Sequence, residues 1–89
     1  MTKEEKIQRG IAAKALMDSG VFIDSLKFLE AAMSEEWKSS RPDDATGRER
    51  LYLMTQIMAD LGRVLRQWSG EAAYEVHEIE RRQQEQHIN

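Results

Sequence analysis

The sequence predicts an all-α fold, a small helical bundle. In it, the second and third helices form an antiparallel hairpin, flanked by a shorter N-terminal helix and a C-terminal helix. Three observations lead to this prediction. Pro42 is the only proline among 89 residues, so little interrupts helix formation. Apolar residues recur at intervals of three and four, which is the spacing of one helix face. Capping sequences stand before two of these periodic segments.

The first predicted helix covers about residues 3–18. Thr2 and Glu5 match a capping box, in which a hydroxyl and a carboxylate satisfy free N–H groups at a helix start. Gly10 weakens the helix by up to about 1 kcal/mol relative to alanine. Gly20 then ends or kinks it, because glycine accepts the left-handed conformation that closes a helix. The expected apolar face consists of Ile7, Ile11, Ala12, Ala15 and Leu16.

The second predicted helix covers about residues 21–38. Its apolar residues are spaced by four, three, four and four, which indicates one amphipathic face. Phe28 and Ala32 are expected to widen the buried face, whereas Ile23 lies outside it. The stripe itself consists of Phe22, Leu26, Leu29, Met33 and Trp37.

The third predicted helix, about residues 43–68, begins between Pro42 and Gly47. Proline is tolerated in the first turn of a helix, because farther in it removes a hydrogen bond and clashes with the preceding turn. Thr46 and Glu49 offer a second capping box. The segment around Pro42 is therefore first of all a turn and a helix start.

An unbroken apolar pattern runs along this third helix, with spacings of three and four throughout. Ile57 and Val64 broaden it to a full helix face. The second helix, joined to the third by a short loop, should lie antiparallel against it. The pattern consists of Leu51, Met54, Met58, Leu61, Leu65 and Trp68.

Gly70 is expected to break or kink the chain before a fourth helix at about residues 71–84. The apolar residues of that helix end at Ile79, so residues 83–89 are expected to fray. Together the helices should make a single domain, residues 1–89, since a chain of this length is too short to divide.

The composition excludes several classes of function. The 16 acidic and 13 basic residues give a net charge of −3, which provides no electrostatic footprint for nucleic acid. The absence of cysteine excludes disulfides and thiolate metal sites. The charged N-terminal segment lacks the apolar core of a signal peptide, and no apolar run approaches the roughly 20 residues that span a bilayer. We therefore expect a soluble cytoplasmic protein with no membrane partner.

No catalytic, cofactor-binding or metal-binding residues are expected. The segment His77–Arg81 comes closest to the His-Glu-x-x-His zinc motif, but Arg81 replaces the second histidine and does not release its proton to bind a metal. His87 does not restore the spacing. Carboxylates that are neighbours in the sequence point to different faces of a helix, so no acid–base pair is indicated. We expect no enzyme activity.

Binding to nucleic acid has two candidate forms. Residues 16–29 can be laid over a helix-turn-helix, but the second helix would present apolar and acidic groups where basic and amide groups are normal. Arginines of the third helix are candidate phosphate contacts, although nearby acids make solvated faces of mixed charge the alternative. We do not expect nucleic acid to be a high-affinity ligand. The arginines are Arg48, Arg50, Arg63 and Arg66.

The large apolar side chains form the candidate surface for protein contacts. Methionine adapts to varied partners and tryptophan is favoured as an interface anchor, although residues on such stripes are also ordinary core residues. A two-helix hairpin cannot bury both of its wide faces, so we expect a homo-oligomer, with another protein as the alternative partner. The candidate oligomer or partner contacts are Phe22, Trp37, Met54, Met58, Leu61, Leu65 and Trp68.

The layout of the chain resembles short all-α proteins encoded among the packaging and head-assembly genes of tailed bacteriophages. The resemblance covers about residues 12–76 and implies a non-enzymatic, self-assembling phage component in the host cytoplasm. The basic DNA-binding domain that precedes the helical hairpin of small terminases has no counterpart here. Two alternatives stay open: an effector that binds and inhibits another protein, and a weak DNA-binding regulator. The resemblance rests on Ala15-Leu16, Phe22, Leu26, Trp37, Pro42-Asp43-Asp44, Arg48-Glu49-Arg50-Leu51-Tyr52 and Gly70-Glu71-Ala72.

Overall fold

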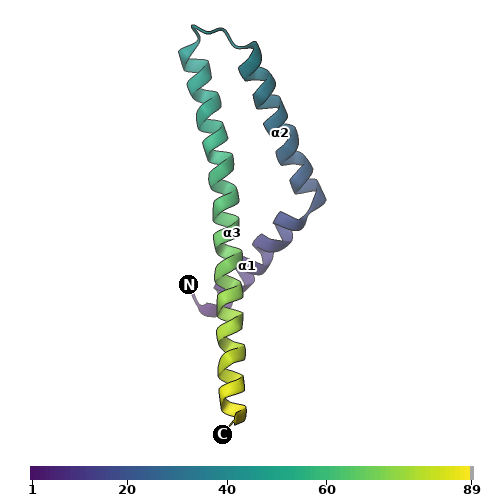
Figure 1. The fold of residues 1–89 in the computed structure, drawn as a ribbon, viewed down its shortest axis with the longest axis vertical. Coiled ribbons are helices and arrows are strands. Elements are labelled where there is room, and N and C mark those ends of the chain that lie inside the picture. The colour runs from purple at the N-terminus through teal and green to yellow at the C-terminus, as the bar shows by residue number, and fades with distance from the viewer. Residues whose placement is uncertain (89) are drawn as a thin grey trace. The chain divides into compact units, whose positions relative to one another are not determined.

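The computed structural model describes the backbone of residues 1–88 and the side chains of residues 1–86. The described chain contains helices and no strand, so the predicted all-α class is confirmed. It forms three helices, shown in Figure 1: α1 (Lys3–Asp18), α2 (Gly20–Ser39) and α3 (Ala45–Ile88).

Contacts within the chain group these helices into two units. Unit 1 combines α1 with the second part of α3, and it covers Met1–Met17 and Val64–Asn89. Unit 2 combines α2 with the first part of α3, and it covers Asp18–Arg63. The N-terminal helix therefore packs on α3.

The start of α1 confirms the first capping box. The N–H of Glu5 donates to Oγ1 of Thr2 at 3.1 Å, and the N–H of Thr2 donates back to Oε1 of Glu5 at 3.4 Å. Two N–H groups that the helix itself leaves without partners are thereby satisfied. The helix also has the predicted bounds, Lys3–Asp18.

The boundary between α1 and α2 lies at the predicted place but has a different cause. Ser19 is extended, with φ −70° and ψ 123°, and its side chain accepts a hydrogen bond from the N–H of Phe22 at 3.5 Å. Gly20 is the first residue of α2, and no described glycine has a positive φ. The chain thus leaves the helix because Ser19 caps the next one, and the predicted left-handed closure at Gly20 is wrong.

The start of α3 falls inside the predicted interval, at Ala45. Its cap is Asp44, whose Oδ1 accepts from the N–H of Gly47 at 3.0 Å, while its carbonyl oxygen accepts from the N–H of Arg48 at 3.1 Å. The second capping box predicted at Thr46 is therefore wrong, because Thr46 already lies in the first turn of the helix.

The largest correction concerns Gly70, where α3 neither breaks nor ends. The predicted helices at 43–68 and 71–84 are one helix, Ala45–Ile88. A glycine costs a helix about 1 kcal/mol, which is too little to interrupt one that continues on both sides. Residues 83–88, expected to fray, are helical, while Asn89 lies outside the described residues.

The end of α3 is supported by charged pairs along one side of the helix. Arg81 contacts Glu78 at 2.8 Å and Glu85 at 2.9 Å, three residues before it and four after it. Pairs at these spacings stabilise exposed helices by a few tenths of a kcal/mol. The hydrogen bond from Arg81 lowers the pKa of Glu78 below its usual value of 4.5. This polar segment therefore stays helical without an apolar face.

Few apolar side chains are buried within the described chain. Met33 and Leu51 are buried in unit 2, and Ala13, Leu65 and Ala72 are buried in unit 1. Among these residues, α2 contributes one to unit 2, and α3 contributes one to unit 2 and two to unit 1. Much of the predicted core lies at the surface.

The face that α1 buries is not the one predicted. Gly10 and Ala13 are its buried residues, whereas Ile11 and Leu16 are exposed. A Cβ atom added at Gly10 would collide with the Cβ of Ala72 and with the carbonyl oxygen of Trp68. Small residues thus let the backbones of α1 and α3 approach closely, and a pattern based on large apolar residues does not detect such a face.

Candidate protein-interaction surface

The inner face of unit 2 brings α2 and α3 together near their connecting loop. Met33 and Leu51 are the buried residues there, and Phe22 and Leu26 are half-buried. Phe28, predicted to widen this face, is 74% exposed, so that prediction is wrong. Residues three, four or seven positions from Met33 lie on its side of α2. Phe28 is five positions before Met33, which places it about 140° away around the helix.

Arg48 is held at one end of this inner face. Its Nε donates to Oγ of Ser40 at 3.0 Å, and its guanidinium lies 5.0 Å from the centre of the Trp37 ring. A guanidinium over an indole face is attracted by the ring quadrupole. The candidate phosphate contact Arg48 therefore has a structural partner, and it fixes the loop end of α2 against α3.

A shallow hollow opens beside these residues, with a volume of about 400 Å³. Its floor is apolar, formed by Met33 and Leu51, and the partly exposed rings of Trp37 and Tyr52 stand at its edge. The carboxylate of Glu30 also lines it. The hollow is open to solvent and could accept one apolar side chain of a partner.

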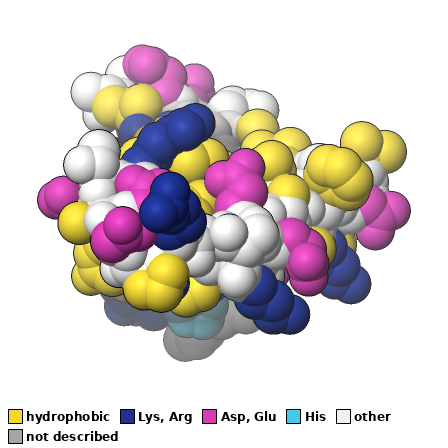
Figure 2. Space-filling view, turned by 90° about the horizontal axis from the view of Figure 1, so that it is seen from above, with side chains coloured by type: hydrophobic (Ala, Val, Ile, Leu, Met, Phe, Trp, Pro, Cys, Tyr) yellow, Lys and Arg dark blue, Asp and Glu magenta, His cyan; other side chains and the backbone are white. Residues whose placement is uncertain are grey.

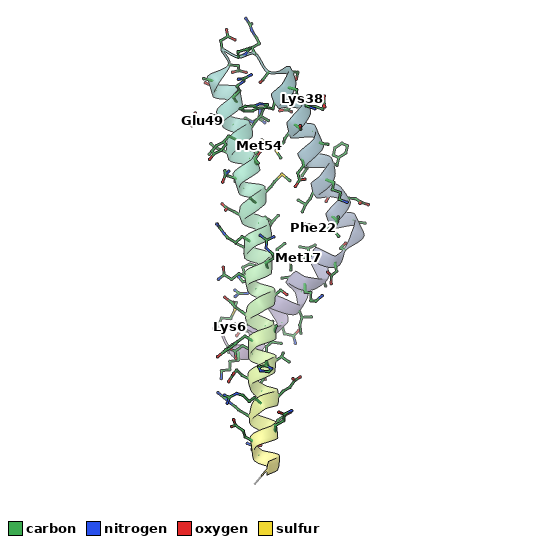
Figure 3. The ribbon with its side chains drawn as sticks, in the orientation of Figure 1. Lys6, Met17, Phe22, Lys38, Glu49 and Met54 are labelled. Carbon is green, nitrogen blue, oxygen red and sulfur yellow. The ribbon has the colours of Figure 1, made fainter. Side chains whose placement is uncertain are left out.

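A second apolar row on α3 in unit 2, which we call the outer seam, consists of Leu53, Ile57 and Leu61. These side chains are 52%, 66% and 41% exposed. They follow one another at intervals of four, so they lie along one side of the helix. Glu49, one interval earlier, points away from α2 in Figure 3. Leu53 follows Glu49 by four residues, so the first residue of the outer seam also lies on a side of α3 away from α2.

Charged residues border the outer seam at both ends. Arg50 is exposed, and no hydrogen bond or ion pair of the described residues involves it. Asp60 accepts from Arg63 at 2.7 Å, with both side chains largely exposed. In Figure 2, apolar side chains lie among acidic and basic ones on the surface seen from above. Arg50 and Asp60, which have opposite charges, therefore stand near the first and the last residue of the outer seam.

Unit 1 contains a contact cluster that the sequence did not reveal. The guanidinium of Arg9 lies 4.4 Å from the centre of the Trp68 ring and 3.1 Å from Oε2 of Glu71. Gln67 donates to the other carboxylate oxygen of Glu71 at 3.2 Å. Nε of Arg9 is buried without a hydrogen-bond partner. The cluster fixes α1 beside α3, next to the close approach at Gly10.

The structure divides the candidate contact residues into two groups. Leu65 is buried, and Phe22, Met58 and Trp68 are half-buried, so these side chains serve the contacts of the chain with itself. Exposed and available to a partner are Trp37, Met54 and Leu61. Of the candidate phosphate contacts, Arg48 and Arg63 have partners, and Arg50 and Arg66 are exposed.

No cluster of metal ligands forms in the described part of the chain, where no three His, Cys, Asp or Glu side chains come together. His77 and Glu80 instead border a hollow of about 470 Å³ over Gly10 and Ala72. The side chain of His87 lies outside the described residues. Across the described residues, no helix is both long enough and apolar enough to pass through a membrane.

Comparison with protein-family models finds no match, and no curated protein and no solved structure matches the chain either. Its function is therefore argued from its own surfaces.

Sequence reasoning missed two features that shape these surfaces. Leu53 lies outside the apolar patterns predicted from the sequence, although its interval of four to Ile57 is a signal for the outer seam. Arg9 was overlooked because nothing in a single sequence pairs it with Glu71, 62 residues away. Only the fold brings those two side chains together.

Proposed function

We propose that this chain works through protein–protein contacts, without catalysis, and that its first partner is a second copy of itself. The observation behind the proposal is the exposed apolar row on α3, formed by Leu53, Ile57 and Leu61. Rows of this kind are uncommon on monomers and mark interaction surfaces. A small domain with few buried residues also gains stability from association.

A second exposed patch supports the same proposal. On α2, Val21 is 81% and Phe28 is 74% exposed, on the side of the helix away from Met33. Unit 2 therefore offers apolar surface from both of its helices. Two patches on one unit allow either a closed pair or a larger ring, depending on which patches meet.

The resemblance to phage packaging and head-assembly proteins gives the assembly a biological setting, in the host cytoplasm. In that setting, the chain is a structural or packaging-associated component. The alternative is an effector that binds another protein through the hollow beside Trp37 and Tyr52. The two differ in what occupies the apolar surface when the protein is alone in solution.

Solution mass tests the proposal. Light scattering behind size-exclusion chromatography, over a wide concentration range, should give a mass that rises above 10.3 kDa as the concentration increases. Ile57→Ser should lower that mass, whereas the matched substitution Ile79→Ser, on the part of α3 in unit 1, should not. A monomer at every concentration would overturn self-assembly and favour a foreign partner. Salt-sensitive DNA binding would favour the regulator instead.

A further inference from the structure

We propose that two copies of the chain pair through their outer seams with the α3 helices antiparallel, so that Arg50 of each copy meets Asp60 of the other. This inference rests on the self-association proposed above and specifies its geometry. It assigns a partner to the exposed seam and to Arg50, and it gives Asp60 a second partner besides Arg63.

The first argument is the symmetry of the row. A two-fold interface uses the same patch on both copies, so the patch must complement itself. Arg50 stands before the outer seam and Asp60 stands in its last turn, one residue before Leu61, and the two charges have opposite signs. An antiparallel pair brings the first end of one seam to the last end of the other. Both ends of the interface then join an arginine to an aspartate.

The second argument is that the charges and two of the three seam residues, Leu53 and Ile57, share one register. The midpoint between Arg50 and Asp60 is residue 55, and the midpoint between Leu53 and Ile57 is also residue 55. In an antiparallel pair, residues with a common midpoint face each other across the interface. The register that joins the charges therefore also places Leu53 of one copy against Ile57 of the other. Leu61 of one copy then faces Glu49 of the other, so the apolar contact of this register consists of Leu53 and Ile57.

The third argument excludes the parallel alternative. A parallel pair in register would set Arg50 against Arg50 and Asp60 against Asp60, and such like charges repel. Among the described residues Arg50 has no hydrogen-bond or ion-pair partner, so its guanidinium is available to a second copy. Asp60 already accepts from Arg63 at 2.7 Å, and a carboxylate has room for a further donor.

Charge reversal tests the pairing, with the dissociation constant measured by sedimentation equilibrium. Arg50→Glu and Asp60→Arg should each weaken self-association by about tenfold or more. The double variant restores opposite charges and should return to within about threefold of the unmodified protein. Arg66→Glu, the same charge change at an exposed position outside the seam, should have no effect.

Cross-linking gives an independent measurement, because the chain has no cysteine of its own. The double variant Arg50→Cys with Asp60→Cys should oxidise to a covalent dimer, whereas each single variant should stay uncross-linked. Cross-linking of the singles would show a parallel pair and overturn the proposal. If both charge-reversal variants dimerised with an unchanged dissociation constant, the proposed register would be wrong, although self-association would remain supported. A protein that never dimerises would overturn both.

Discussion

Replacing Gly10 by alanine should destabilise unit 1, although the same substitution normally stabilises a helix. Alanine gains about 1 kcal/mol of helix propensity over glycine. The new methyl group, however, would collide with the Cβ of Ala72 and with the carbonyl oxygen of Trp68. A carbonyl group in a helix cannot rotate aside, so α1 must move away from α3.

The expected size follows from these two opposing effects. Overpacking costs about 1–3 kcal/mol, and contact with backbone places this substitution in the upper half of that range. Subtracting the gain in propensity leaves a net loss of about 1–2 kcal/mol. In a domain of this size, each kcal/mol shifts Tm by about 4–8 °C.

Gly70→Ala is the matched control, because it lies in the same unit and in a helix. A Cβ atom there meets nothing within 4 Å, so only the propensity gain remains, about 1 kcal/mol of added stability. Both variants should be unfolded with urea and followed by circular dichroism at several protein concentrations, since association also changes stability. If Gly10→Ala proved as stabilising as Gly70→Ala, the close approach of α1 to α3 would be wrong.

Three further predictions concern single contacts. Arg9→Ala should lower the free energy of unfolding by about 1–2 kcal/mol in urea titrations, because the Trp68 ring loses its stacked cation and its cover; an unchanged midpoint would argue against the cluster. Ser19→Ala should cost about 0.5–2 kcal/mol through loss of the α2 cap, and Ser19→Asp, which restores an acceptor, should recover most of it. Acidification should loosen the end of α3, because Arg81 lowers the pKa of Glu78. The stabilising contact between the two side chains is complete above pH 4.5, and it is lost as the pH falls through the lowered pKa. Carboxyl titration by NMR should show that lowered pKa, and its return to the usual value in Arg81→Gln.

Local signals in the sequence predicted the bounds of the helices better than the contacts between the helices. The capping box at Thr2 and Glu5 and the turn around Pro42 depend on neighbouring residues only, and both lie where they were expected. Gly70 misled the prediction because a glycine is compatible with a helix end and also with a helix interior at a modest cost. One residue could not distinguish the two.

The contact faces were harder to predict for a physical reason. Apolar periodicity identifies the side of a helix that can be buried, but two helices that touch through Gly10 and Ala13 bury small side chains and leave Ile11 outside. On α3 the apolar arc is broader than one neighbouring helix can cover. The sequence therefore predicts which residues form the apolar arc. Only the fold shows that Leu51 is buried and that Ile57 is exposed.

The placement of the two tryptophans gives the molecule an optical probe in each unit. Trp37 in unit 2 and Trp68 in unit 1 each lie beneath an arginine guanidinium. When either stacked pair separates, the emission of its indole changes as water replaces the cation. In a variant that keeps a single tryptophan, made by Trp37→Phe or Trp68→Phe, fluorescence reports the melting of one unit alone. Coincident melting curves would identify one cooperative structure along α3, and separate midpoints would identify two.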